Sequence, residues 1–172
     1  MIATARLRLR PPRAGDLHAL HAIMADPRAM RFWGTPPHAD IAQTRDFLAA
    51  MLATPRDGGE ELVIERDGGV IGRVALWRIA EVGFFLHPDH WRQGLMREAL
   101  GAALPHFFAR FPDVDRITAD TDPQNAAALG LLAALGFVET GRADRTFRVD
   151  GVWSGSVYLA LDRPADQPGV IR

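Results

Sequence analysis

Alternation of apolar and polar residues predicts strands in several separate segments of the chain. Segment 6–10 alternates arginine with leucine, and two proline residues end it. Segment 61–77 holds two β-patterned runs joined by Asp-Gly-Gly, which is typical of a β-hairpin. Segment 82–86 is apolar throughout, as expected for a buried strand. Further strands are expected at 115–120 and, as a pair, within 137–161.

Helical patterns occupy the segments between these strands. The first is expected at 16–24 and the second at 40–54, separated by an aromatic and proline-containing connector at 26–38. A third helix opens at Gly94 and runs to residue 110, and a fourth covers 125–135. The expected order is therefore β, α, α, β, β, β, α, β, α, β, β, which predicts an α/β (α+β) protein with about seven strands and about four helices.

The junction between strand 82–86 and the helix that opens at Gly94 is a candidate anion site. The first backbone N–H groups of a helix have no internal partners and lie at the positive end of its dipole. A glycine at that point lets a phosphate approach closely. The sequence contains neither the P-loop pattern nor the Rossmann glycine pattern, so the usual nucleotide loops are not expected.

Three motifs around this junction resemble one protein family. Ala80-Glu81-Val82-Gly83-Phe84 followed by Trp91 to Leu100 is similar to the acetyl-CoA signature of the GCN5-related N-acetyltransferases (GNAT), in particular the branch that acetylates N-termini of ribosomal proteins. Segments 4–17 and 125–137 resemble the first strand with its helix entry and the Asn-to-Gly-Phe helix of that branch. The resemblance implies a mixed, mostly antiparallel sheet that splays between its fourth and fifth strands.

The resemblance also implies a binding site for acetyl-CoA. Its pyrophosphate would be held by backbone N–H groups at the helix start, namely those of Gln93, Gly94, Leu95 and Met96. Asn125 would contact the cofactor from the other side of the splay, and it is equally suited to cap its own helix. Arg97 is either a further phosphate ligand or a solvated surface residue. Arg92 stands where the branch usually has glycine, and Met96 where the family prefers glycine or alanine. Arg92 would shield the turn or add charge beside the phosphates, so we expect binding to be kept at a strength that the sequence does not give.

Amine acetylation needs a neutral amine, donors for the oxyanion and a route for the released proton. Glu81 is the candidate general base, acting through water, and His87 and His90 are alternatives. The resemblance places oxyanion or thioester contacts at the backbone of Phe85 and Leu86, at a β-bulge that frees a donor.

Two positions depart from the family in ways that affect catalysis. Leu132 occupies the place where many relatives carry a tyrosine proposed to protonate the departing thiolate, so water would have to do so here. Ala128 replaces a family serine, which removes a hydroxyl group from the site.

Composition restricts the chemistry further. The 172-residue chain has a net charge of −1, which gives no reason to expect nucleic acid or membrane partners. It has no cysteine, so an acyl-cysteine intermediate is impossible. Its only serines, Ser154 and Ser156, lack the nucleophile-elbow pattern, and the histidines lack metal-site spacing. No apolar run is long enough to span a bilayer, so we expect a cytoplasmic protein.

The main hypothesis is a single N-acetyltransferase domain over 1–172, with a loose tail at 164–172. It would transfer acetyl from acetyl-CoA to a primary amine, either a protein N-terminus or a small molecule, by direct attack in a ternary complex. The acceptor pocket is expected between segments 31–38 and 142–153, with tryptophans such as Trp33 on its walls. The alternatives are a non-catalytic acyl-CoA-binding module and an enzyme for longer acyl chains. A homodimer is possible.

Overall fold

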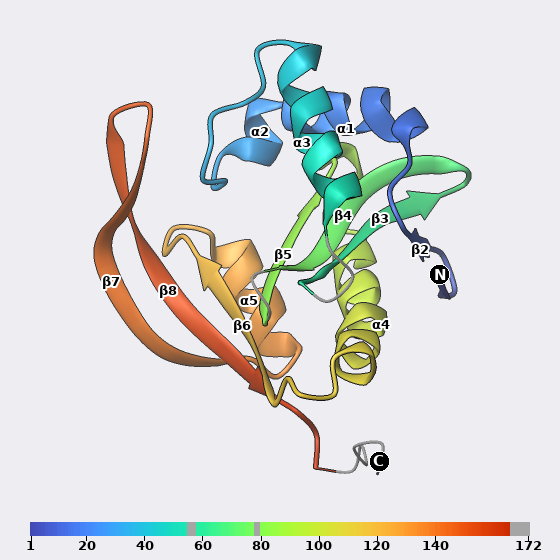
Figure 1. The fold of residues 1–172 in the computed structure, drawn as a ribbon. Coiled ribbons are helices and arrows are strands. Elements are labelled where there is room, and N and C mark those ends of the chain that lie inside the picture. The colour runs from blue at the N-terminus through green and yellow to red at the C-terminus, as the bar shows by residue number, and fades with distance from the viewer. Residues whose placement is uncertain (55–57, 78–79, 166–172) are drawn as a thin grey trace.

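One eight-stranded sheet organises the molecule (Figure 1). The computed structural model describes residues 1–54, 58–77 and 80–165. The strand order is β1-β2-β3-β4-β5-β6-β8-β7, and every neighbouring pair is antiparallel except β5 and β6. The strands are β1 (Ile2–Ala3), β2 (Arg8–Arg10), β3 (Glu60–Arg66), β4 (Gly69–Trp77), β5 (Glu81–Leu86), β6 (Arg116–Thr121), β7 (Val138–Val149) and β8 (Val152–Asp162).

The α/β (α+β) prediction is confirmed, with two differences of detail. The short strand β1 pairs with β2 and makes eight strands where about seven are expected. Its two residues are too few to show alternation in the sequence. The tail predicted to be loose, 164–172, lies mostly outside the described residues, which end at 165.

The predicted helices are found close to their expected limits. They are α1 (Leu17–Met24), α2 (Pro27–Met30), α3 (Ile41–Ala53), α4 (Leu95–Arg110) and α5 (Ala126–Ala134), with single 3-10 turns at 14–16 and 88–90. Asp40 and Gln43 form a capping box that starts α3. Helix α2 was not expected in the 26–38 connector. It forms because Asp26 accepts a hydrogen bond from Arg28 N and Pro27 has a backbone suited to a first helical position.

The two faces of the sheet are covered differently. Helices α4 and α5 pack on one face, where side chains such as Val82, Leu100 and Leu132 share one buried core. Helices α1 and α3 cover the other face only over the β3–β5 half, with a smaller core that includes Leu48 and Phe85. The β6–β8–β7 half of that second face carries no helix in Figure 1, and the β7–β8 hairpin stands apart from α1–α3.

A buried ion pair lies on the helix-covered part of this second face. The Arg73 side chain is 2 % exposed, and its Nε and Nη2 each donate to a Glu61 carboxylate oxygen at 2.6 Å. The guanidinium group also lies over the rings of Phe47 at 5.3 Å and Trp77 at 5.9 Å. Within the described residues, Arg73 Nη1 has no hydrogen-bond partner. The pair therefore relies on one bidentate contact and aromatic packing.

Strands β5 and β6 separate soon after they meet. Among the described residues the two pair only at Glu81 and Thr118, where Thr118 N donates to Ala80 O at 2.5 Å. Parallel strands that stay together would continue this ladder, whereas here they diverge towards their C-terminal ends. The predicted splay is thus present, and it falls between β5 and β6 because β1 shifts the strand count by one.

Candidate active site

The turn from β5 into α4 has the geometry of an anion site. Helix α4 begins at Leu95, so the N–H groups of its first turn have no intrahelical acceptor. Gly94 precedes it with a φ of 74°, a left-handed conformation that other residues adopt at a cost. Leu95 is buried in the core and fixes the helix, while Gly94 itself is exposed. The turn therefore presents backbone N–H groups and a helix N-terminus to a ligand.

Arginines from distant segments surround this turn. Arg6 donates from Nη1 to Gln93 O at 2.9 Å, and its Nη2 lies 3.6 Å from the position that a Cβ on Gly94 would occupy. Arg66 donates to the Gln93 side chain at 2.8 Å. Arg92 and Arg97 are exposed in the turn and the first helical turn. Four positive side chains thus accompany the N–H groups, which favours a ligand with several negative charges.

The backbone conformation of Arg92 suits glycine better than arginine. Its φ is 60°, so an arginine is held in the left-handed region. We expect Arg92→Gly to raise the free energy of unfolding by up to about 1 kcal/mol, measured by chemical denaturation. The matched variant Arg97→Gly, inside α4, should lower it by up to about 1 kcal/mol. Equal destabilisation by both variants would contradict this account.

Glu98 in the first turn of α4 anchors the N-terminal segment to the start of that helix. It accepts from Thr4 Oγ1 at 2.6 Å, from Arg6 N at 2.9 Å and from Arg6 Nε at 2.6 Å. The hydrogen bond from Thr4, followed by those from Arg6, holds the pKa of Glu98 below its ordinary value.

A lowered carboxyl pKa gives stability above the ordinary pKa that is lost as the pH falls through the folded-state value. We expect Glu98→Gln to be less stable than wild type by about 1 to 3 kcal/mol at neutral pH. The difference should shrink as the pH falls from about 7 to about 3 in denaturation experiments. The exposed Glu139→Gln should give a smaller difference. A difference for Glu98→Gln that does not change with pH would contradict this role.

Every second residue of β5 directs its backbone N–H and C=O groups into the splay. His87 N donates to Ile71 O, and the register continues without a shift from Gly72 and Leu86 to Trp77 and Glu81. The expected bulge at Phe85 and Leu86 is therefore wrong. Because antiparallel ladders alternate, Phe85 N–H faces β4, whereas Phe84 and Leu86 direct theirs towards β6. Simple alternation thus supplies the donors that the bulge was expected to free.

A small cavity of about 90 Å³ occupies the splay. Its walls come from β5, from the end of β6, from the start of α5 and from the connector before α3. The lining residues are Phe32, Trp33, Val82, Gly83, Phe84, Ala119, Asp120, Thr121, Asp122, Asn125 and Ala128. Asn125 Oδ1 accepts from Ala128 N at 3.1 Å, so this residue caps α5 and lines the cavity at once. Ala128 contributes only a methyl group to the wall of the cavity.

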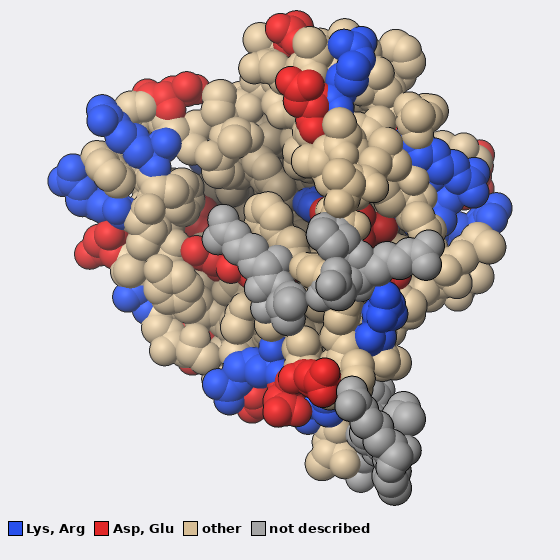
Figure 2. Space-filling model, viewed as in Figure 1, with Lys and Arg blue, Asp and Glu red and all other residues tan. Residues whose placement is uncertain are grey.

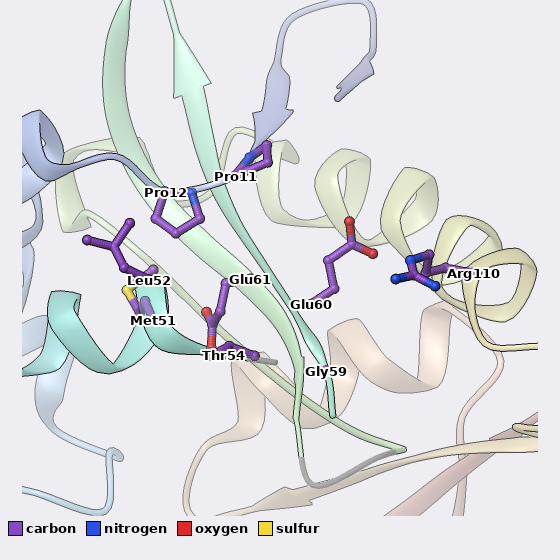
Figure 3. Close-up of a pocket in the computed structure, with 9 residues that line it drawn as sticks. All are labelled: Pro11, Pro12, Met51, Leu52, Thr54, Gly59, Glu60, Glu61 and Arg110. Atoms are coloured by element: carbon purple, nitrogen blue, oxygen red, sulfur yellow. The ribbon is translucent and has the colours of Figure 1, made fainter. Parts of the chain in front are cut away.

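A larger cavity of about 370 Å³ lies elsewhere, among Pro11, Pro12, Met51, Leu52, Thr54, Gly59, Glu60, Glu61 and Arg110 (Figure 3). Glu60 and Arg110 point towards each other across it in Figure 3. None of its walls comes from the β5–α4 turn or the start of α5. The sequence motifs therefore border the smaller cavity and not the larger one.

A comparison with protein families decides the identity of this arrangement. The family model that describes the acetyltransferase (GNAT) domain matches residues 6–138, which include the β5–α4 turn and α5. The chain belongs to the GNAT family. Among curated relatives, an uncharacterized N-acetyltransferase of Bacillus licheniformis is 26% identical over 147 residues, which cover 80% of this chain and 82% of the relative.

Solved GNAT structures share the fold at low sequence identity. Spermidine N-acetyltransferase from Vibrio cholerae, in complex with CoA and spermine, superposes with a TM-score of 0.80 at 22% identity, covering 92% of this chain and 96% of the other. An acetyltransferase of Salmonella typhimurium that modifies the N-terminal serine of ribosomal protein L7/L12 gives 0.82 at 18% identity, covering 94% and 97%. The GNAT fold therefore accommodates different amines in neighbours of this chain.

The remaining candidate residues lie outside the small cavity. Glu81 lies at the closed end of the splay, in the pair with Thr118, and does not line the cavity. His87 accepts a hydrogen bond from Asp89 N in the turn, and neither His87 nor His90 lines the cavity. Leu132 is fully buried in the core. Burial, followed by the nearby His87, lowers the pKa of His90. These placements do not test the predicted roles.

Some residues of the site escape sequence reasoning. Arg6, between β1 and β2, and Arg66, at the end of β3, approach the turn from segments far away in the sequence, and only the fold brings them there. Asp120 and Asp122 lie in an ordinary-looking stretch before α5. Two acidic residues spaced by two on a strand could have indicated a shared face, but not a cavity. Within the described part of the chain, no His, Asp and Glu side chains group closely enough for a metal ion, and no helix is long and apolar enough to cross a membrane.

Proposed function

We propose that this GNAT protein transfers the acetyl group of acetyl-CoA to a primary amine. The observation that carries the proposal is that one strand, β5, lines the cavity in the splay and leads along the chain into the turn at Gly94. A ligand with a polyanionic end and an extended arm fits this path. Its diphosphate would lie at the start of α4, and its arm would run between β5 and β6.

The residues of the path suit such a ligand. Backbone N–H groups from Gln93 to Met96, with Arg6, Arg92 and Arg97 nearby, would bind the diphosphate. The N–H groups of Phe84 and Leu86 face the splay, where an amide-containing arm could pair as an added strand. Asn125 would contact the arm from the other side, from the helix it caps.

The reaction is a direct transfer in a ternary complex. The chain has no cysteine, and both of its serines donate hydrogen bonds to aspartates. Attack therefore comes from the acceptor amine itself, which forms the amide bond while the carbon–sulfur bond breaks and CoA leaves as the thiol. Backbone donors on the splay side of β5 would stabilise the oxyanion that forms in between.

The small cavity favours a short acyl group. Its volume is only about 90 Å³. Phe84 lines it, whereas Phe85 and Phe108 are buried in the two cores and do not enlarge it. An acetyl group meeting an amine nitrogen suits this space better than a longer acyl chain.

Acetyl-CoA with a panel of primary amines tests the proposal. The panel should include polyamines, amino-acid amides and peptides with free N-termini, and the readouts are thiol release and the mass of the acetylated product. Saturable product formation by wild type supports an N-acetyltransferase. Tight binding of acetyl-CoA without product from any amine would instead support an acyl-CoA-binding module.

A further inference from the structure

An organised pair of aspartates lies beside the cavity, on the open half of the sheet. Asp120 ends β6 together with Thr121, and Asp122 follows the strand. Ser156 Oγ donates to Asp120 Oδ2 at 3.0 Å, and Ser154 Oγ donates to Asp122. These are the only two serines of the chain, and each holds one aspartate. Figure 2 shows acidic side chains between the β7–β8 hairpin and the helical layer.

The two aspartates differ in how many of their carboxylate oxygens already accept hydrogen bonds. Asp122 is buried, and its second oxygen accepts from Gln124 N at 2.7 Å, so both of its carboxylate oxygens are engaged. Asp120 is exposed, and among the described residues only its Oδ2 accepts a hydrogen bond. Thr146 lies 2.7 Å from the same Ser156 hydroxyl and helps to fix it. Asp120 is thus an oriented carboxylate with one oxygen available to a ligand.

The strand register places Asp120 at the point where the splay opens. Glu81 and Thr118 pair at its closed end, so Gly83 and Asp120, two residues further on, lie across from each other on the same face of the sheet. Gly83 contributes no side chain. A Cβ there would lie 3.8 Å from Trp77 Nε1 and 3.9 Å from both Arg73 Nη1 and Trp33 Cη2, so these side chains bound the cavity on this side. Gly83 and Asp120 both line the cavity, and only Asp120 contributes a side chain to it.

We propose that Asp120 binds the acceptor amine as its ammonium form and accepts its proton, which rests on the proposed function. This carboxylate lines the cavity, whereas Glu81 does not. The geometry therefore favours Asp120 over Glu81 as the group that contacts the amine. It also defines the acceptor class as amines that are cationic in solution and present little bulk next to the nitrogen.

The proton and bond changes balance as follows. The bound ammonium gives one proton to Asp120, which passes it to solvent, and the neutral amine then attacks the thioester carbonyl carbon to form the carbon–nitrogen bond. The nitrogen loses a second proton to Asp120 as the carbon–sulfur bond breaks. One proton from solvent converts the thiolate to the thiol. The products are the amide, CoA and one released proton.

A pair of amines that differ mainly in basicity tests the proposal. Ethylamine is protonated at neutral pH, whereas 2,2,2-trifluoroethylamine is largely neutral. We expect Asp120→Asn to lower kcat/KM for ethylamine by about 100-fold and for the fluorinated amine by less than about tenfold, with an unchanged KM for acetyl-CoA. A purely structural role would reduce both amines alike. Asp115→Asn, on the exposed approach to β6, is the matched control and should resemble wild type.

Two results would overturn the proposal. One is a Asp120→Asn variant that keeps more than about half of its activity with ethylamine. The other is a Glu81→Gln variant with the larger loss and the same dependence on basicity.

If wild type acetylates neither amine, the proposed function fails for these probes. The role of Asp120 is then tested by measuring whether it binds ethylammonium. Ethylammonium titrated into the CoA complex should shift the backbone amide signals of Gly83 and Asp120 in wild type and not in Asp120→Asn. Equal shifts in both proteins would reject the role of Asp120.

Discussion

Replacing Gly94 with aspartate is expected to raise the KM for acetyl-CoA by about 100-fold, which corresponds to about 3 kcal/mol. The carboxylate would stand where the diphosphate approaches the N–H groups of α4 and would repel it. It would also pair with Arg6, whose Nη2 lies 3.6 Å from the Cβ position. Aspartate tolerates the left-handed conformation better than most residues, so the fold should persist. Steady-state kinetics and calorimetric binding of acetyl-CoA measure the change.

Two matched variants separate charge from backbone strain. Gly94→Asn has nearly the same shape without the charge, and should raise the KM by only about tenfold. Gly68→Asp introduces the same residue at a left-handed glycine in the β3–β4 turn, where a Cβ meets nothing within 4 Å. It should bind acetyl-CoA like wild type. Similar KM values for Gly94→Asp and Gly68→Asp would show that the turn does not bind the diphosphate.

Replacing Arg73 with methionine is expected to lower the free energy of unfolding by about 3 to 5 kcal/mol. The substitution leaves the buried carboxylate of Glu61 without its bidentate partner, and it removes a cation from between aromatic rings. Chemical denaturation measures the loss, provided that the m-value of the variant equals that of wild type.

The double variant Arg73→Met with Glu61→Gln isolates the unpaired charge. Because it leaves no buried carboxylate, it should be more stable than Arg73→Met alone. The exposed pair of Arg116 and Asp162 is the control, since Arg116→Met should change stability far less than Arg73→Met does. A double variant no more stable than Arg73→Met would show that the loss comes from packing instead of from the charge.

Local signals account for much of the fold that the sequence predicts. Asp40 with Gln43 marks the start of α3, and the Asp67-Gly68 turn marks the β3–β4 hairpin, because capping and turn chemistry act between neighbouring residues. The splay is expected only through the family resemblance. Alternation in segment 6–10 would place Arg10 on the exposed face of its strand. Arg10 is buried instead, because it donates two hydrogen bonds to Asp16 once the chain has folded back.

The candidate site likewise contains residues that local motifs predict and residues that only long-range contacts bring in. Gly94 and Asn125 stand in continuous motifs, and the structure places them at a helix start and a helix cap beside the splay. Arg6 and Asp120 reach the site through contacts over long sequence distances, which periodicity does not encode. The N–H groups proposed as oxyanion donors also depend on register, since one extra residue in β5 would turn the N–H of Phe85 towards β6 in place of that of Phe84.

Backbone amide signals followed by NMR during a titration with acetyl-CoA test the central claim most directly. The account predicts that the largest shifts arise from Gln93 to Met96 and from Phe84 and Leu86, which border the turn and the splay. Amides around the larger cavity, such as those of Met51 and Glu60, should change little. Shifts confined to that larger cavity, with those of Gly94 and Leu95 unchanged, would contradict the account.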